Sequence, residues 1–284
     1  MASVLAVYTL SLLANATRRF HPRGTERLLR LLHHPDRRSW GIESIAPLDG
    51  EGLRLHVHTG NFLEWQVFFY GTYEPEVAAV LRNHIRPGRH AIDVGANIGI
   101  HTLRMARAAK PGRVVACEPS QALCARLNAN LALNRVTNVS VRGLAISAQS
   151  GAVTLYLTQS LAQHGHLTFD PAAGISGSPE QVCAMSLDDL VDAEAISGID
   201  VVKIDTDGLE GAVLQGAEQL LAQEHPALVF EYTIEGWSRA GYAWPQVLDR
   251  LRRLGYGSFH EITRRGLHSI SSPPPAFMNV LATI

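Results

Sequence analysis

The sequence predicts an α/β fold: a doubly wound, mostly parallel seven-stranded sheet with a helical and short-strand N-terminal extension. A strand, a glycine-rich turn, a helix and a second strand follow one another between His90 and Glu118. Later apolar strands such as Val201–Ile204 also alternate with helical segments, which is typical of a parallel sheet. Two final apolar segments, Tyr256–Ile262 and Phe277–Ile284, predict an antiparallel pair of strands after the fifth strand.

Residues 1–60 are expected to form the extension, and residues 61–284 the main domain. Apolar residues between Val4 and Leu13 recur at helical spacing, and four leucines between residues 28 and 32 predict a second helix. Short strands are expected on either side of a turn at Asp49–Gly52. Arginine is dense here, which indicates either a patch for an anionic substrate or membrane surface, or simply a solvated helix face. The arginines are Arg18, Arg19, Arg23, Arg27, Arg30, Arg37 and Arg38.

The segment Gly71–Pro75 precedes the first strand of the main sheet. Pro75 suits the first turn of a helix whose apolar stripe continues to Ile85. Tyr73 and Glu74 stand just before this helix, so they could close over a bound cofactor. Alternatively, Glu74 only favours the start of the helix through its negative charge.

The turn Gly95-Ala96-Asn97-Ile98-Gly99 follows this first strand. Gly95 allows a sharp turn and the close approach of a ligand, and Gly99 lets the helix pack near the strand. The middle glycine of the dinucleotide fingerprint is absent, which weakens the prediction of a pyrophosphate at the helix N-terminus. Asp93 instead places a carboxylate at the cofactor end of the strand, which suits a cofactor that carries an ammonium or sulfonium group.

Glu118 ends the second strand, where a carboxylate can accept hydrogen bonds from both hydroxyls of a ribose. Pro119 then begins the next helix. The third strand is predicted to combine Val139–Val141 and Leu144–Ile146. The loop after the third strand of such a sheet faces the base of a nucleotide-like cofactor, which makes Ala145 a candidate contact.

Residues 159–181 form a long segment without a clear pattern. Long loops in compact domains are often lids or binding loops, or else disordered. His166 in this segment is a candidate general base, although a surface histidine more often has no catalytic role.

Charged residues occur at the end of the strand that contains Val202 and Ile204. Lys203 and Asp205 fall on the opposite parity of this strand. Charges in a buried strand are costly unless paired, but beside a ligand at a strand's carboxyl end they are commonly functional. The two residues could also form nothing more than an ion pair. Glu231, near the end of the fifth strand, is a further candidate proton acceptor.

Two nearby acids have a structural interpretation. Asp207 is expected to be a helix N-cap, and Glu210, three residues later, completes a capping box. No CxxC or HxxxH pattern occurs in the sequence, and one carboxylate at Asp205 does not define a cation site. No metal is therefore predicted.

Composition limits the class of protein. The chain has 284 residues, of which 46% are hydrophobic, so it can bury a sizeable core. A net charge of −1 argues against nucleic acid as a partner. No uncharged apolar stretch reaches about eighteen residues, so no transmembrane segment is expected, and the N-terminus lacks the positive charge that begins a signal peptide. Three scattered cysteines favour a reducing compartment, and we expect a cytoplasmic protein.

The motif DVGANIG, with GTYEP before it and VVKIDTDGLEGAVLQGA after it, resembles the FkbM family of class I S-adenosylmethionine-dependent methyltransferases. The resemblance extends from about Phe62 to the C-terminus. It implies a Rossmann-like class I methyltransferase fold, S-adenosylmethionine as the cofactor, and O-methylation, often of sugars, polyketides or other secondary metabolites. The residues expected to bind this cofactor are Tyr73, Glu74, Asp93, Gly95, Ala96, Asn97, Gly99, Glu118, Pro119 and Ala145.

The expected function is therefore methyl transfer to a hydroxyl oxygen of a sugar, glycolipid or secondary metabolite. The candidate catalytic residues are Asp205, Lys203, Glu231 and His166. The alternative is a nucleotide-cofactor-binding protein of Rossmann-like fold, either a nicotinamide-dependent oxidoreductase or a non-catalytic binding module. The missing glycine argues against the oxidoreductase. The expected partners are a small-molecule hydroxyl acceptor and a second copy of the chain, joined in a homodimer through the N-terminal helices.

Overall fold

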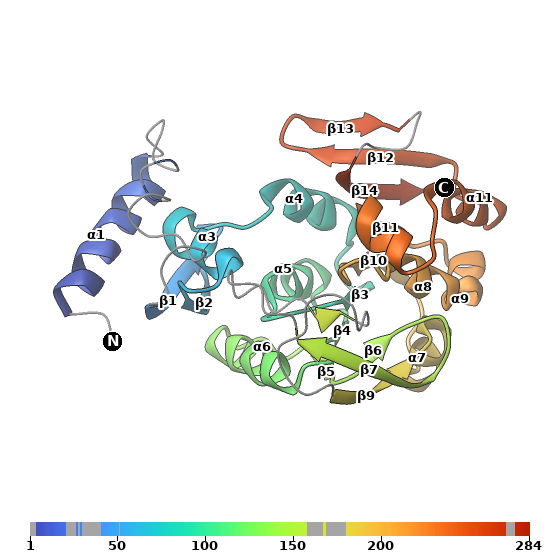
Figure 1. Ribbon diagram of the computed structural model, residues 1–284, viewed down its shortest axis with the longest axis horizontal. Coiled ribbons are helices and arrows are strands. Elements are labelled where there is room, and N and C mark those ends of the chain that lie inside the picture. The colour runs from blue at the N-terminus through green and yellow to red at the C-terminus, as the bar shows by residue number, and fades with distance from the viewer. Residues whose placement is uncertain are drawn as a thin grey trace.

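A central sheet of eight strands dominates the computed structural model, which describes residues 4–20, 27, 29, 41–50, 52–157, 167–168, 180–270 and 276–284 (Figure 1). The order is β13-β12-β14-β11-β10-β3-β4-β5. β3, β4, β5, β10 and β11 run parallel, and β14, β12 and β13 continue the sheet antiparallel. The strands are β3 (His90–Val94), β4 (Val114–Cys117), β5 (Val139–Arg142), β10 (Ile199–Ile204), β11 (Ala227–Thr233), β12 (Ser258–Thr263), β13 (Gly266–Ser269) and β14 (Phe277–Thr283).

The predicted α/β fold with a mostly parallel sheet is confirmed, with one strand more than expected. The additional strand, β13, pairs with β12 at the edge of the sheet. All four of its residues are exposed, so it carries no hydrophobic alternation by which the sequence could predict it.

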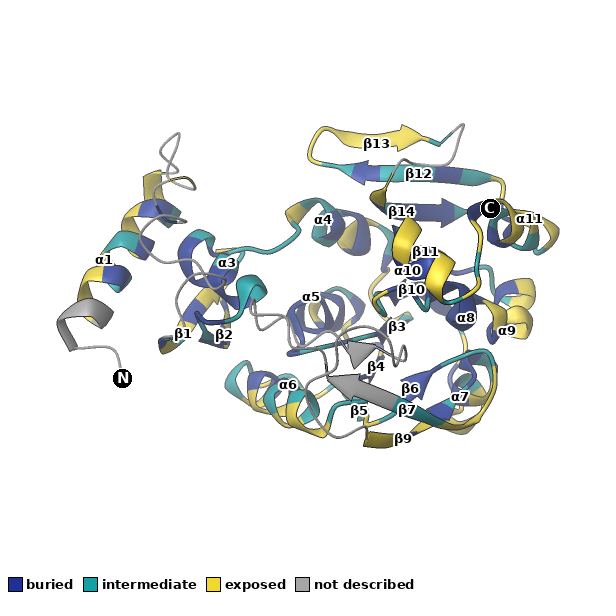
Figure 2. Ribbon diagram, viewed as in Figure 1, coloured by how far each residue is buried: buried dark blue, intermediate teal, exposed yellow. Residues whose placement is uncertain are grey.

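Helices cover both faces of the sheet, which is why β3, β4 and β10 are buried along almost their whole length. Ala91, Val201 and Val229 pack with α4 and α5 on one face. Ile92, Val202 and Phe230 pack on the other face with α7 to α11, and Figure 2 shows the strands buried between these layers. The helices are α4 (Pro75–His84), α5 (Ile100–Ala109), α6 (Gln121–Leu133), α7 (Leu187–Glu194), α8 (Glu210–Gln215), α9 (Glu218–Gln223), α10 (Ile234–Arg239) and α11 (Trp244–Arg253).

The predicted third strand is wrong in one respect, because its two halves belong to different sheets. Val139–Arg142 is β5 of the central sheet, whereas β6 (Ala145–Ile146) pairs with β9 (Glu180–Met185). The chain turns between them, where the Leu144 N–H donates to the carbonyl of Arg142. β7 and β8 complete this smaller sheet, and their bounds are Gly151–Leu157 and Leu167–Thr168.

The N-terminal region packs as a small layer of its own at one end of the molecule (Figure 1). It comprises α1 (Val4–Phe20), the hairpin of β1 (Glu43–Leu48) and β2 (Leu53–His58), and α3 (Phe62–Tyr70). The core of this layer includes Leu55, Trp65 and Phe69. Of the predicted second helix, only residues 27 and 29 are among those described, and both are helical.

One face of α1 lies open to solvent. Tyr8, Leu12 and Phe20 are each more than half exposed on it. No helix in the described part of the chain is long and apolar enough to cross a membrane. The predicted homodimer through the N-terminal helices stays a prediction.

Side-chain amides of α6 join the hairpin to the main domain. Asn130 accepts a hydrogen bond from the His56 N–H at 2.8 Å and donates to the carbonyl of Ile98 at 2.8 Å. Asn134 likewise accepts from the Arg54 N–H and donates to the Arg54 carbonyl. The asparagines of α6 thus replace the backbone partners that a neighbouring strand would offer to β2.

We predict that Asn130→Ala lowers the free energy of unfolding by about 1–3 kcal/mol, because it leaves the buried carbonyl of Ile98 and the partly buried N–H of His56 without the partner that Asn130 supplies. Chemical denaturation measures this change. Asn128→Ala is the matched control, since Asn128 is exposed on the same helix and bonds only to a carbonyl of its own helix. It should change stability by less than about 0.5 kcal/mol. Equal losses in the two variants would contradict the bridging role of Asn130.

Candidate active site

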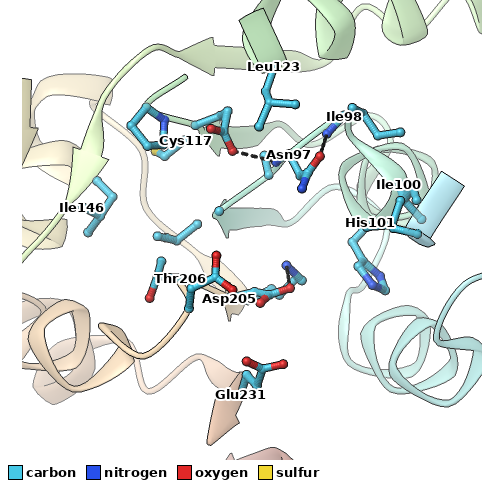
Figure 3. Close-up of a pocket in the computed structure, with 18 of the residues that line it drawn as sticks. Asn97, Ile98, Ile100, His101, Cys117, Leu123, Ile146, Asp205, Thr206 and Glu231 are labelled. Atoms are coloured by element: carbon cyan, nitrogen blue, oxygen red, sulfur yellow. Dashed lines mark hydrogen bonds and ion pairs between the residues drawn. The ribbon is translucent and has the colours of Figure 1, made fainter. Parts of the chain in front are cut away.

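A pocket opens at the carboxyl ends of β3, β4, β10 and β11, beside the point where the strand order reverses between β3 and β10. Open α/β sheets bind ligands at such a switch point. Figure 3 shows Leu123 and Glu231 on opposite sides of this pocket, with Asp205 and Thr206 between them.

The shape of the glycine turn after β3 is set first by close contacts with other segments of the same chain. Gly95 has φ 76°, and a Cβ atom on it would lie 1.8 Å from the carbonyl oxygen of Asp205. Gly99 has φ 91°, and a Cβ atom there would lie 2.2 Å from a methyl carbon of Leu127. Both positions therefore need glycine for folding, whatever the ligand. Gly95 lines the pocket and Gly99 does not.

The Glu118 side chain joins two backbone segments at the pocket by hydrogen bonds. Its two carboxylate oxygens accept hydrogen bonds from the backbone N–H groups of Asn97 and Ser120, each at 2.9 Å (Figure 3). Burial raises the pKa of Glu118 to about 7, and these two bonds offset part of the rise. A carboxylate oxygen can accept more than one hydrogen bond, so the side chain keeps acceptor capacity toward the pocket.

Asp93 lies beneath the pocket rather than in its wall. It is fully buried, and its Oδ2 accepts a hydrogen bond from Thr102 at 2.6 Å. Its Oδ1 has no hydrogen-bond partner among the described residues, but it lies 3.4 Å from Nζ of Lys203. The position expected to meet a ligand directly instead faces a buried ammonium group.

Lys203 lies between two carboxylates. Its Nζ is 3.3 Å from Asp205 Oδ2 and 3.4 Å from Asp93 Oδ1. Burial alone would lower the pKa of Lys203, but Asp205, Asp93 and Glu74 together outweigh burial and raise it. Lys203 is therefore a fixed cation that orients Asp205.

Carboxyl groups crowd the edge of the pocket beyond Lys203. Burial raises the pKa of Glu231 to about 9, and the charges of Asp205, Glu210 and Asp207 add to the effect. The Asp205 side chain is 37% exposed to the pocket, yet the surrounding protein still withdraws it from water and raises its pKa. Lys203 opposes that rise and favours the charged form of Asp205.

The loop after β10 is organised by Glu210, which is fully buried. Its Oε1 accepts from the N–H groups of Thr206 and Gly208, and its Oε2 accepts from the indole of Trp237 at 2.8 Å. The expected capping box is therefore wrong. Asp207 has φ 53° and lies in the pocket wall, and α8 begins only at Glu210, because the Glu210 carboxylate turns back to the loop.

The segment before α4 also reaches the pocket. Tyr73 lines it, whereas Glu74 lies behind it with its carboxylate 3.1 Å from Nε2 of His101. Within the described part of the chain, the Glu74 side chain makes no capping bond to α4. The interpretation of Glu74 as a simple helix-start acid is thus not supported by the direction of its side chain.

Ten of the predicted residues line the pocket and three lie just outside it. Those in the wall are Tyr73, Gly95, Ala96, Asn97, Glu118, Pro119, Ala145, Lys203, Asp205 and Glu231. Those outside it are Glu74, Asp93 and Gly99. His166 lies outside the described residues. Among the residues that are described, no group of three or more His, Cys, Asp or Glu could hold a metal ion.

Sequence reasoning missed a second wall of the pocket. Asn61, Phe62 and Leu63 line it from the start of α3, and His101 lines it from the first turn of α5. The position of His101, two residues after Gly99, was a usable signal, because the first turn of the helix after such a turn faces the ligand. The contribution of α3 left no comparable trace in the sequence.

Comparisons with known proteins identify the family of this chain. A family model described as the methyltransferase FkbM domain matches residues 93–257. The methyltransferase sdnD of Sordaria araneosa is 28% identical over 202 residues, which cover 61% of this chain and 74% of that protein.

Two solved structures are also similar. One is an FkbM methyltransferase from Methylobacillus flagellatus KT, with 16% identity and a TM-score of 0.45 over 72% of this chain. The match spans only 50% of the length of that protein's chain. The other is a putative methyltransferase from Streptococcus mutans in complex with SAH, with 13% identity and a TM-score of 0.43 over 73% of this chain and 96% of the other. Because the family model covers more than half of the sequence, the predicted resemblance is confirmed, and this chain belongs to the FkbM family of methyltransferases.

Proposed function

We propose that this methyltransferase binds S-adenosylmethionine in the pocket and methylates a hydroxyl oxygen of a sugar, glycolipid or secondary metabolite. The family implies the methyl donor. One observation carries the proposal: Glu118 and the pair Asp205–Glu231 enter a single pocket from opposite sides of the switch point. A ribose-binding carboxylate and a proton acceptor would therefore face the same ligand.

The residues present fit this cofactor. Leu123, Leu144 and Ile146 give an apolar wall for a flat base beside Ala145 and Pro119. Glu118 is suited to the ribose hydroxyls. At the other end, the carboxylates of Asp205 and Asp207 outnumber the single ammonium of Lys203, which favours a ligand that carries positive charge.

Gly95, Ala96 and Asn97 would approach the ligand with their backbone, next to Tyr73. Asp93 would act from beneath, through Lys203. The distance of 3.4 Å between its Oδ1 and Nζ of Lys203 supports this indirect role.

S-adenosylmethionine supplies a methyl carbon made electrophilic by its positively charged sulfur. The protein must hold the acceptor oxygen in line with that carbon and take up its proton. Asp205 is the proton acceptor in this proposal, because Lys203 keeps it charged at 3.3 Å. Glu231, with its pKa near 9, is protonated at neutral pH and donates a hydrogen bond to the acceptor oxygen.

Membership of a methyltransferase family argues against the oxidoreductase alternative. The test is twofold: equilibrium binding of S-adenosylmethionine and NAD by calorimetry, and methyl transfer from labelled cofactor to sugars, glycolipids and polyketides. Tighter binding of NAD would contradict the cofactor assignment. Labelling only of amines, with every hydroxyl acceptor unmodified, would contradict the O-methyl specificity.

We predict that affinity for S-adenosylhomocysteine rises by about five- to ten-fold between roughly pH 6 and pH 8. The Glu118 carboxyl has a pKa of about 7 in the free protein, and ribose hydroxyls bind its charged form. Binding therefore favours proton loss, and affinity grows as pH increases through that value. Titration calorimetry at several pH values measures the slope. In Glu118→Gln the slope should flatten, and an unchanged slope would remove Glu118 from the ribose site.

We predict that Asp205→Asn lowers turnover by about a hundred-fold while affinity for S-adenosylhomocysteine stays within about three-fold. Glu231→Gln should keep turnover at pH 7 within about three-fold, because an amide replaces a protonated acid as hydrogen-bond donor. The two variants are matched, since each exchanges one carboxyl for an amide in the same pocket. Labelled-methyl transfer per folded molecule decides between them. If Glu231→Gln is the slower enzyme, the proton acceptor is Glu231.

A further inference from the structure

His101 has a fixed arrangement of its ring nitrogens. An arginine side chain has only donors, and Arg104 Nη1 lies 3.3 Å from His101 Nδ1. Nδ1 must therefore accept, which leaves the proton on Nε2. The Nε2–H then donates to Oε2 of Glu74 at 3.1 Å.

The ring is also kept neutral. His101 is 5% exposed, and burial lowers the pKa of its imidazole well below the usual value. Arg104 and Lys203 lower it further, and the carboxylates of Asp93 and Asp49 oppose this only in part. The contact with Glu74 is thus a directed hydrogen bond from a neutral donor.

Arg104 is held from the N-terminal hairpin. Its Nε and Nη2 donate to the two carboxylate oxygens of Asp49 at 2.6 and 2.7 Å. Its Nη1 also donates to the carbonyl of Tyr73 at 2.8 Å. This two-pronged pairing fixes the guanidinium plane. Asp49 lies at the end of β1, 55 residues before Arg104, and its N–H donates to the carbonyl of Gly71 at 2.6 Å.

Glu74 has the unusual backbone that this arrangement requires. Its φ is 43°, a left-handed conformation that costs energy in a residue other than glycine. The conformation turns its carboxylate away from α4 and toward His101. Oε1 also lies 3.5 Å from Nδ2 of Asn279 in β14. Burial raises the pKa of Glu74, and the nearby positive charge of Lys203 opposes this rise.

We propose that residues 41–72 are a working part of the active site, in which Asp49, through Arg104, fixes the tautomer and the direction of His101 in the pocket wall, with Glu74 behind the pocket as the acceptor of its Nε2–H. The proposal rests on the proposed function and extends it to residues that do not touch the ligand. Asp49, Arg104 and Glu74 are positioning residues, and His101 lines the pocket. The predicted boundary at residue 61 would then divide one site into two pieces.

A double-mutant cycle on the affinity for S-adenosylhomocysteine tests the relay. His101→Leu should weaken binding about ten-fold, and Glu74→Gln by a similar factor. In the Glu74→Gln background, His101→Leu should cost less than about two-fold more, because Glu74 acts on the ligand only through His101. His101→Gln retains a donor at the position of Nε2 and should stay within about three-fold of the unmodified protein. Additive losses, or no recovery with glutamine, would refute the relay.

Nuclear magnetic resonance of protein with ¹⁵N-labelled histidine tests the same relay without ligand. The His101 signal, assigned by its loss in His101→Gln, should show a neutral ring protonated on Nε2 between roughly pH 5.5 and pH 8. The paired variant Asp49→Asn/Arg104→Met removes both charges together, so neither is left buried alone. Its His101 should accept a proton at a higher pH, because the nearest cation is gone. An unchanged titration would overturn the proposal.

The two experiments also separate the relay from the proposed function. If the unmodified protein fails to bind S-adenosylhomocysteine, the cofactor assignment is wrong. The resonance of His101 then still shows whether the hairpin controls this ring. If binding is normal but the cycle is additive, the function stands and the relay is refuted.

Discussion

The buried ammonium of Lys203 is the interaction on which the site depends. Lys203 of β10 and Asp93 of β3 are direct partners in the register of the two parallel strands. Strand pairing therefore brings an ammonium and a carboxylate together in the centre of the sheet, 4% and 0% exposed. Two buried charges are stable there only as a pair. Removing either one leaves the other buried and unpaired, which lowers the free energy of unfolding by about 3–5 kcal/mol. The same pair sets the position of Asp205 at the pocket.

The sequence indicated many of the residues that line this edge of the sheet, but not which of them are buried beneath the pocket. Strand parity separated Lys203 and Asp205 from the core positions, and the position of Glu118 after β4 pointed to the pocket. Asp93 lies on the same face of the sheet as Lys203, but nothing in the sequence motif indicates that Thr102 and Lys203 enclose it. A loss of ligand binding in an Asp93 variant would therefore report on the buried pair as well as on the ligand.

Two contacts that the sequence did not reveal share one physical cause, which is that the side chains bond to partners far along the chain. Glu210 was predicted as half of a local capping box, yet it bonds to Trp237, 27 residues away. Asp49 lies in the predicted turn, but its partner Arg104 is 55 residues away. Local patterns predict local bonds well, but such distant pairings depend on packing that a single sequence does not reveal.

The close approach at Gly95 has a mechanical consequence. The backbone of the turn that would touch the ligand abuts the carbonyl of Asp205, with no side chain between them to deform. The two also share a strand interface, because the Asp205 N–H donates to the carbonyl of Val94 at 3.0 Å. Interiors packed this tightly transmit displacement rather than absorb it. The turn and Asp205, the proposed proton acceptor, are thus one rigid part, so a shift of the turn when a ligand enters would also shift Asp205.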